Sequence, residues 1–168
     1  MGKGGRRARA TILPYSLMDL ETIADLPVVT VADDDAHLFL WSTRRGFREG
    51  WAAWVARAWG FEPIGEVIWG LRNPGFGTVL GNDHEPVLVG RRGDLPFTTG
   101  FRMAGVHFWR QTYDHGKVHS AKPEGFLDFV EQVSPGPYVE LFSRRHRMGW
   151  DVWGSESANT AKLALCQT

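Results

Sequence analysis

The chain has 168 residues, of which 43% are hydrophobic, and its 19 basic and 19 acidic side chains cancel to a formal net charge of zero. These values are typical of one soluble globular domain, and no apolar run approaches the ~20 residues that a membrane-spanning helix needs. The single cysteine, Cys166, excludes an internal disulfide framework and favours a cytoplasmic location. The neutral balance gives no argument for nucleic acid, but clustered basic residues create local positive potential. The arginines cluster at residues 6–9, 44–48, 91–92 and 144–147.

Residues 1–14 are basic and rich in glycine, without a helical or strand period. This pattern predicts a flexible segment followed by a single domain over residues 15–168. At the start of that domain, Asp19 is suited to cap a short helix that Pro27 stops. The continuous apolar run Ala36–Thr43 then predicts a strand that is buried on both faces.

The next segment, Gly46–Trp59, is predicted to be one helix, because its apolar residues fall on one stripe and Gly60 is suited to end it. That stripe consists of Phe47, Trp51, Trp54, Val55 and Ala58. Two further strands are predicted at Phe61–Trp69 and Glu85–Gly90. Long loops, which are often functional, are expected between these two strands and again over residues 91–121.

The C-terminal part is predicted to contain a helix over Pro123–Val133, a strand over Tyr138–Phe142 and a short helix over Ser157–Leu165. The alternation of helices with apolar strands indicates an α/β fold with a mostly parallel sheet, covered by helices on both faces. In such sheets, ligands bind at the carboxyl ends of the strands. The strand Tyr138–Phe142 runs directly into Ser143-Arg144-Arg145-His146-Arg147, so we expect a ligand site there.

The histidines suggest a different kind of site. His115 and His119 have a spacing that places two metal ligands on one face of a helix. Gly116 lies between them in a segment with the composition of a loop, and no third ligand is suitably spaced, so no metal site is expected. A metal-dependent hydrolase stays an alternative, which bound metal would reveal.

Six short motifs, taken together, resemble one known family in their order and spacing. They are Y-S-L-M-D-L-E-T-I-A-D-L-P-V, H-L-F-L-W-S-T, W-G-F-E-P-I-G-E-V-I-W, H-E-P-V-L-V-G-R-R-G, S-A-K-P, and V-E-L-F-S-R-R-H with G-W-D-V-W-G-S-E. The family is the MT-A group, named for the seventy-kilodalton messenger-RNA adenosine methyltransferase subunit. It also contains bacterial and phage DNA adenine methyltransferases. The resemblance extends from Tyr15 to Glu156.

The resemblance implies a Rossmann-like domain that transfers a methyl group from S-adenosylmethionine to the exocyclic amino group of adenine, in DNA rather than RNA, in a bacterial or phage-infected cell. Lys122 resembles the lysine that meets the cofactor's carboxylate, and Arg144 and His146 resemble the pair that holds its ribose and methionine parts. The full set that it assigns to the cofactor is Lys122, Arg144, His146, Arg147, Ser155 and Glu156. The set that it assigns to the substrate is Tyr15, Arg72, His84 and Glu85.

One motif of the family is missing. The family's reaction centre is an Asp-Pro-Pro-Trp tetrapeptide whose polar oxygens accept the hydrogens of the adenine amino group, and this sequence contains none. We expect the chain to be an N-terminally shortened methyltransferase without the strand that bears this motif. The nearest stand-in is Asn73, in Asn73-Pro74-Gly75-Phe76. The alternative is a catalytically inactive subunit that binds nucleic acid or scaffolds a partner, as a homodimer or a heterodimer with a related subunit.

Overall fold

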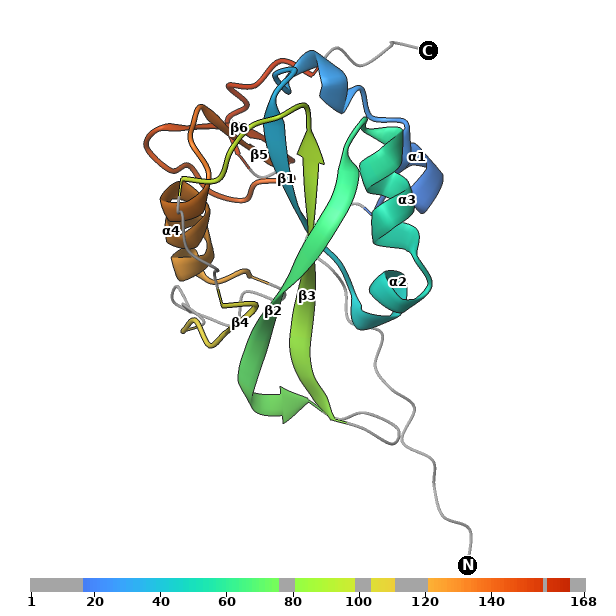
Figure 1. The fold of residues 1–168 in the computed structure, drawn as a ribbon, viewed down its shortest axis with the longest axis vertical. Coiled ribbons are helices and arrows are strands. Elements are labelled where there is room, and N and C mark those ends of the chain that lie inside the picture. Colours follow the sequence, from blue (N-terminus) through green and yellow to red (C-terminus); the bar gives the residue numbers. More distant parts are fainter. Residues whose placement is uncertain (1–16, 76–80, 99–103, 111–120, 156, 164–168) are drawn as a thin grey trace, which may run out of the picture.

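The computed structural model describes residues 17–75, 81–98, 104–110, 121–155 and 157–163. Over these residues the chain forms helices packed around strands (Figure 1). The helices are α1 (Leu20–Ala24), the 3₁₀ helix η1 (Val28–Thr30), α2 (Arg44–Arg48), α3 (Trp51–Ala58) and α4 (Glu124–Val133). The strands are β1 (Ala36–Trp41), β2 (Glu62–Gly75), β3 (Asn82–Arg92), β4 (Val106–His107), β5 (Tyr138–Leu141) and β6 (Trp150–Trp153). None of the helices in this part of the chain is long and apolar enough to cross a membrane.

The described strands form two sheets. The sequence predicts a mostly parallel sheet, and this prediction is wrong for the larger one, which is mostly antiparallel. Its order is β1-β3-β2-β4, in which β3 is antiparallel to both of its neighbours and the short β4 is parallel to β2. The smaller sheet pairs β5 with β6 in parallel. The error has a local cause. The segment between β2 and β3 is too short for the crossover that parallel neighbours need, so these two strands form a hairpin.

This hairpin also replaces most of the first predicted loop. β2 continues through Gly75 and β3 begins at Asn82, so both strands are longer than their apolar cores indicate. Asn73 therefore lies in a strand and not in a loop. Figure 1 shows the hairpin extending beyond the helices that pack on the sheet.

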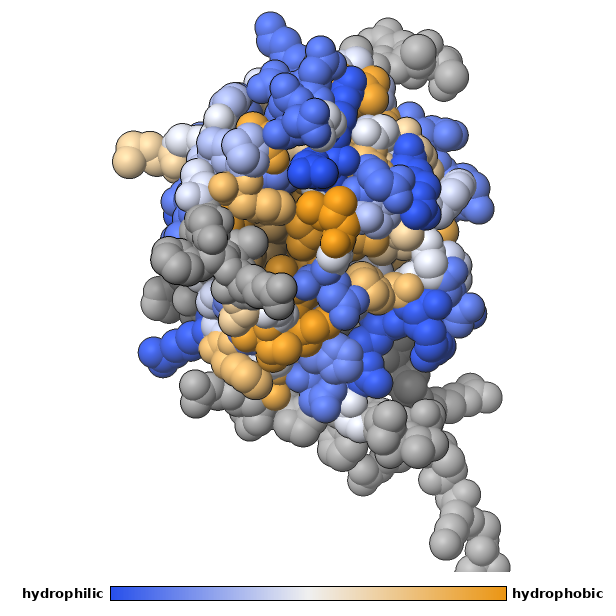
Figure 2. All heavy atoms as spheres, in the orientation of Figure 1, coloured by the Kyte–Doolittle hydropathy of each residue, from blue (hydrophilic) through white to orange (hydrophobic). Residues whose placement is uncertain are grey.

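Helices cover both faces of the four-stranded sheet, as predicted, and Figure 1 shows α3 and α4 on opposite sides of it. The alternation of side chains along β3 serves both layers. Leu88 packs with α1 and α3, whereas Val87 and Val89 pack with α4. Between the two helical layers, Figure 2 shows hydrophobic residues in the middle of the viewed face, ringed by hydrophilic ones.

The predicted helix before Gly60 is in fact two helices. Gly50 adopts a left-handed conformation, with φ of 78°, and separates α2 from α3. Gly60, with φ of 82°, follows the end of α3, as predicted. The predicted apolar stripe is wrong in part, because Trp51 and Trp54 lie in the same unbroken helix as Val55 but outside the face of α3 that packs on the core. Val55 is buried, but Trp51 and Trp54 are 38% and 46% exposed.

Of the remaining predictions for helices and strands, some are confirmed and others are wrong. Asp19 caps α1 as predicted, since its side chain accepts a hydrogen bond from the backbone N–H of Thr22 at 2.7 Å. β1 is a strand, but its side chains are half-buried because it is an edge strand of the larger sheet. The predicted C-terminal helix does not form over residues 157–163, the part of it that the structure describes. The strand β6 is not expected from the sequence.

Candidate functional site

Lys122 lies where the larger sheet meets α4. Its ammonium group forms an ion pair with the carboxylate of Glu85 on β3, and its Nζ lies 4.8 Å from the centre of the Trp41 ring at the end of β1. The two side chains of the ion pair are 34% and 33% exposed. At this exposure the ion pair and the cation–π contact each stabilise the fold by about 1 kcal/mol or less. The two contacts therefore orient the lysine, which still reaches solvent.

The ring of Trp41 belongs to an aromatic wall that also contains Trp69 and Phe126. Trp41 and Trp69 project from the same face of the sheet and meet edge to face, with ring centres 5.9 Å apart. Phe126 lies on the buried side of α4, and the centre of its ring is 4.7 Å from that of Trp41. The indole N–H of Trp69 donates to the carbonyl of Trp109 at 3.0 Å, so the buried polar group is satisfied. These contacts give Trp41 a fixed position beside Lys122.

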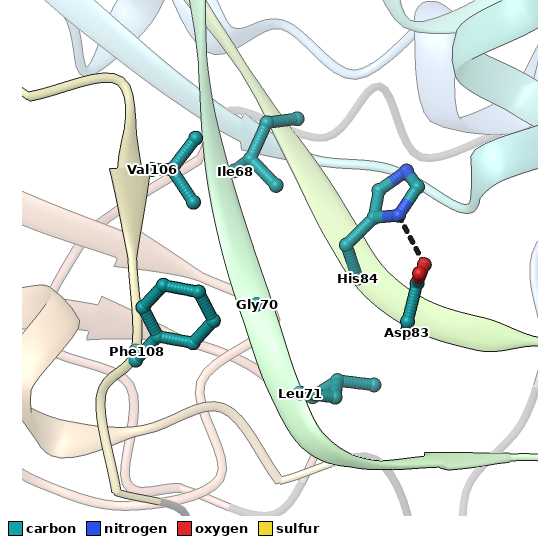
Figure 3. A pocket seen from close by; sticks show the side chains of 7 residues that line it. All are labelled: Ile68, Gly70, Leu71, Asp83, His84, Val106 and Phe108. Carbon is teal, nitrogen blue, oxygen red and sulfur yellow. Dashed lines mark hydrogen bonds and ion pairs between the residues drawn. The ribbon is translucent and has the colours of Figure 1, made fainter.

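His84 and Glu85 are adjacent in sequence but face opposite sides of the sheet, because side chains alternate along a strand. Glu85 lies on the α4 side with Lys122, whereas His84 lines a hollow of about 460 Å³ on the other side (Figure 3). His84 Nδ1 lies 2.6 Å from Asp83 Oδ1, and this hydrogen bond lowers the pKa of Asp83. The two predicted substrate residues are therefore separated by the sheet.

The hollow beside His84 is mostly apolar and open. Figure 3 shows the ring of Phe108 against Gly70 on β2, and a Cβ added at Gly70 would lie 2.3 Å from Phe108 Cε1. A second hollow, of about 370 Å³, adjoins the first because both are lined by Ile68 and His84. Residues of α2, including Arg48, line its other end. Together the two hollows form a groove across the hairpin, from α2 to the segment after β4.

A second group of predicted site residues follows β5. Phe142 has a left-handed backbone, with φ of 59°, and turns the chain as the strand ends. The next residue, Ser143, is buried, and its hydroxyl lies 2.9 Å from Glu140 Oε2 and 2.6 Å from the carbonyl oxygen of Arg145. Gly154, directly after β6, packs on this turn because it lacks a side chain. A Cβ there would lie 2.2 Å from the Ser143 carbonyl oxygen.

An ion pair joins this group to the region of Lys122. Arg145 Nη1 lies 3.1 Å from Glu124 Oε1, and Glu124 is the first residue of α4, shortly after Lys122 in the chain. The two side chains are 36% and 59% exposed, so the pair adds little stability. Its effect is to hold the segment after β5 close to the start of α4.

Arg147 has a different environment from its neighbours. Its Nε donates to Glu131 Oε1 at 2.8 Å, and its Nη2 donates to Glu131 Oε2 and Asp128 Oδ1, both at 2.7 Å. The Trp150 indole N–H also donates to Glu131, at 2.6 Å. Hydrogen bonds from Arg147 and then Trp150 lower the pKa of Glu131, and the bond to Glu131 raises the pKa of Arg147. The guanidinium group is thus engaged with α4, and its predicted contact with a cofactor stays a prediction.

The other predicted residues are placed as follows. Arg144 is half-buried and makes contacts with its surroundings, whereas His146 and Ser155 are exposed. The predicted residues that lie outside the described part of the chain are Tyr15 and Glu156, together with the side chains of Arg72 and Asn73. The roles predicted for all of these residues stay predictions. Sequence reasoning missed Trp41, although an aromatic residue at the carboxyl end of a predicted strand is a usable signal.

Metal ligands do not gather in the described ranges. There, no three side chains of His, Cys, Asp or Glu lie close enough to hold a metal ion. His115 and His119, the pair with metal-ligand spacing, lie outside those ranges.

Comparison with known proteins assigns the family. A sequence model of the MT-A70 family matches residues 4–156. The chain is 32% identical over 147 residues to the Type II methyltransferase M.MunI of Mycoplasma sp, an alignment that covers 84% of this chain and 59% of that protein. It is 28% identical over 156 residues to the human N(6)-adenosine-methyltransferase catalytic subunit METTL3, covering 86% of this chain and 25% of that protein. The chain thus spans somewhat over half of one relative and a quarter of the other. It belongs to the MT-A70 family, the family that its six motifs resemble.

Proposed function

We propose that the chain is an S-adenosylmethionine-dependent methyltransferase domain that acts on the exocyclic amino group of adenine in DNA. The observation that carries the proposal is the position of Lys122, a partly exposed cation oriented by Glu85 and Trp41 in a chain of the MT-A70 family. DNA is preferred to RNA because the identity to the type II methyltransferase exceeds that to METTL3.

The side chains around Lys122 fit the chemistry of this cofactor. Its carboxylate needs a cation, and its ribose diol needs hydrogen-bond acceptors. Lys122 would hold the carboxylate, and Arg144 and His146 would hold the methionine and ribose parts. The ribose or adenine would contact Ser155 and Glu156. When bound, the cofactor supplies a methyl group on a positively charged sulfur.

The chain also has to orient the target base. Tyr15, Arg72 and His84 are the residues proposed for the substrate side, whereas Glu85 would act on the cofactor side by orienting Lys122. The adenine nitrogen becomes a nucleophile when polar oxygens accept its amino hydrogens in a preorganised site. Because the sequence lacks Asp-Pro-Pro-Trp, we propose that the chain binds the cofactor on its own and transfers the methyl group when that motif is supplied.

Two forms of the protein test this proposal. The first is the chain of 168 residues, and the second is the same chain preceded by a strand that ends in Asp-Pro-Pro-Trp. In calorimetry both should bind S-adenosylmethionine with a dissociation constant on the order of micromolar. Labelled methyl groups should enter adenine in DNA with the second form. If neither form binds the cofactor, the proposal is wrong.

The missing tetrapeptide favours one second candidate, an inactive subunit that presents nucleic acid to a related, active partner. Such a subunit would bind DNA with an affinity that falls steeply with salt, because phosphate contacts release counterions. It would bind no S-adenosylmethionine in either form. Calorimetry with the cofactor therefore separates the two candidates, and co-purification with an active subunit would support the second.

A further inference from the structure

The outer side of α3 carries two exposed tryptophans. The inner side consists of buried residues, namely Ala52, Val55, Ala56 and Trp59. Trp51 and Trp54 lie on the other side, and residues three apart are neighbours on a helix surface. Indole rings are normally stabilised by burial, and exposed apolar surface that is contiguous marks binding sites. Two adjacent exposed rings therefore indicate a partner.

Three arginines are near neighbours of these two tryptophans along α2 and α3. The guanidinium carbon of Arg45 lies 5.3 Å from the centre of the Trp51 ring. The side chains of Arg48 and Arg57 are 73% and 57% exposed, and each forms an ion pair with an exposed glutamate. Such exposed pairs are weak, so both arginines can exchange partners at low cost. We call the set of Arg45, Arg48, Trp51, Trp54 and Arg57 the tryptophan–arginine patch.

We propose that the tryptophan–arginine patch binds a single strand of nucleic acid. Indole rings stack on unpaired bases of any sequence, and guanidinium groups bind phosphate oxygens with paired hydrogen bonds. Arg45 already lies over the Trp51 ring, the arrangement in which a cation adds to base stacking. Duplex DNA offers its phosphates but hides the faces of its bases, so the two tryptophans favour an unpaired strand.

A second copy of the chain is the main competing occupant. A two-fold interface uses the same surface of both copies, so the arginines of one patch would meet those of the other. Like charges brought together in this way oppose association. A polyanion, in contrast, complements the three arginines of the patch.

A strand bound to the patch would supply the target base for the proposed reaction. This part of the inference rests on the proposed function. α2 begins shortly after Trp41, the residue whose ring contacts Lys122. Arg44, the first residue of α2, donates hydrogen bonds to the carbonyl oxygen of Gly81 at 2.6 Å and to Asn82 Oδ1 at 3.1 Å. These bonds fix α2 against the hairpin. A strand that crosses the patch would thus lead toward the carboxyl end of β1.

Fluorescence anisotropy with a labelled, mixed-sequence single-stranded oligonucleotide tests the proposal without any cofactor. Trp51→Ala and Trp54→Ala should each weaken binding about tenfold, the effect of removing one stacked base. Arg48→Gln should reduce the slope of log affinity against log salt by about 0.7, the value for one lost phosphate on a single strand. The matched controls are Val29→Ala, at a residue 49% exposed in η1, and Arg91→Gln, at an exposed residue near the end of β3. Neither control should change the affinity.

Three results would overturn the proposal. They are no binding of the oligonucleotide, equal binding by the tryptophan variants and the controls, and a tryptophan-dependent dimer in sedimentation without oligonucleotide binding. Calorimetry with S-adenosylmethionine keeps the two proposals apart, since the tryptophan variants should bind the cofactor normally. Patch-dependent strand binding without cofactor binding would refute the proposed function alone. Cofactor binding with patch-independent strand binding would refute this inference alone.

Discussion

The ammonium nitrogen of Lys122 lies 4.8 Å from the centre of the Trp41 ring, while the same group is ion-paired with Glu85. The lysine is therefore oriented by one aromatic ring and one carboxylate that come from different strands. Such an arrangement fixes the direction of a flexible side chain before a ligand arrives, which reduces the entropy that binding would otherwise cost.

The first prediction concerns this contact. Lys122→Gln should weaken binding of S-adenosylmethionine about tenfold or more, because hydrogen bonds to charged groups are worth about 1.5–3 kcal/mol. Glu85→Gln keeps the cation and removes both its competitor and one of the two contacts that orient it, so the affinity should change much less than in Lys122→Gln. Isothermal calorimetry on both variants makes the comparison. A greater loss from Glu85→Gln than from Lys122→Gln would contradict the assignment of the carboxylate site to the lysine.

The second prediction concerns the close approach of Gly154 to the turn after β5. In Gly154→Ala, the new Cβ would meet the backbone oxygen and nitrogen of Ser143 at 2.2 and 2.8 Å, and backbone atoms cannot rotate away. Urea denaturation should show a loss of about 1–3 kcal/mol, the usual cost of overpacking. The control is Gly65→Ala, where a Cβ meets no atom within 4 Å. Equal stability of the two variants would show that the turn can move.

The third prediction separates structure from ligand binding at Arg147. Arg147→Met keeps an unbranched apolar stem but removes the hydrogen bonds to Glu131 and Asp128. The free energy of unfolding should fall by about 1 kcal/mol, because the ion pairs are partly exposed. The affinity for S-adenosylmethionine should not change. The opposite outcome, lost affinity with unchanged stability, would support the cofactor role that the resemblance implies.

The fourth prediction is a pH dependence of stability that arises at His37. Its ring stacks on Phe97 with ring centres 3.9 Å apart, and its two nitrogens lie 2.8 Å from Ser134 Oγ and 3.0 Å from the carbonyl oxygen of Leu95. Burial lowers the pKa of His37 below its ordinary value of 6.5. The hydrogen bond to Leu95 opposes this shift, and the charge of Arg91 adds to it.

A lowered pKa means that the folded state favours the neutral ring of His37. Its contribution to stability is therefore fully present above pH 6.5, the ordinary value, and is lost as the pH falls below it. The melting temperature should be lower at about pH 5.5 than at about pH 7.5. His37→Gln should reduce this difference, whereas His84→Gln, at a side chain that is 38% exposed, should leave it in place. An unchanged difference in His37→Gln would assign the effect to another group.

The sequence predicted features that depend on near neighbours. The cap at Asp19, the left-handed glycine at Gly60 and the helix after Pro123 each follow from contacts within one turn of helix. The prediction of mostly parallel strands was wrong because apolar runs do not encode which neighbour a strand pairs with. The predicted burial of Trp51 and Trp54 was wrong because apolar residues occur all round α3, and the fold packs the face of Ala52, Val55 and Ala56 on the core instead.

In the candidate site, too, local motifs could be recognised from the sequence, whereas contacts between distant segments could not. The motif that contains Lys122 was recognised, but its contact with Trp41 joins distant parts of the chain and depends on the fold. The ion pair between Arg145 and Glu124 likewise links the end of β5 to α4, and neither residue carries a local signal for the other. The hydrogen bonds of Arg147 to α4 could not be anticipated, because its position in the motif suggested that it contacts the cofactor.

The separation of His84 from Glu85 has a consequence for how the hairpin can change over evolutionary time. β3 is paired on both sides, so its register is held by β1 and β2 together. A slip by one residue in one direction would bring His84 beside Lys122 and Asp83 into the groove. A slip in the other direction would bring Pro86 beside Lys122 and Glu85 into the groove. Insertions that shift β3 along its neighbours therefore preserve both faces when they move it by an even number of residues. The parity of the pairing, and not the length of the hairpin, is what the chemistry constrains.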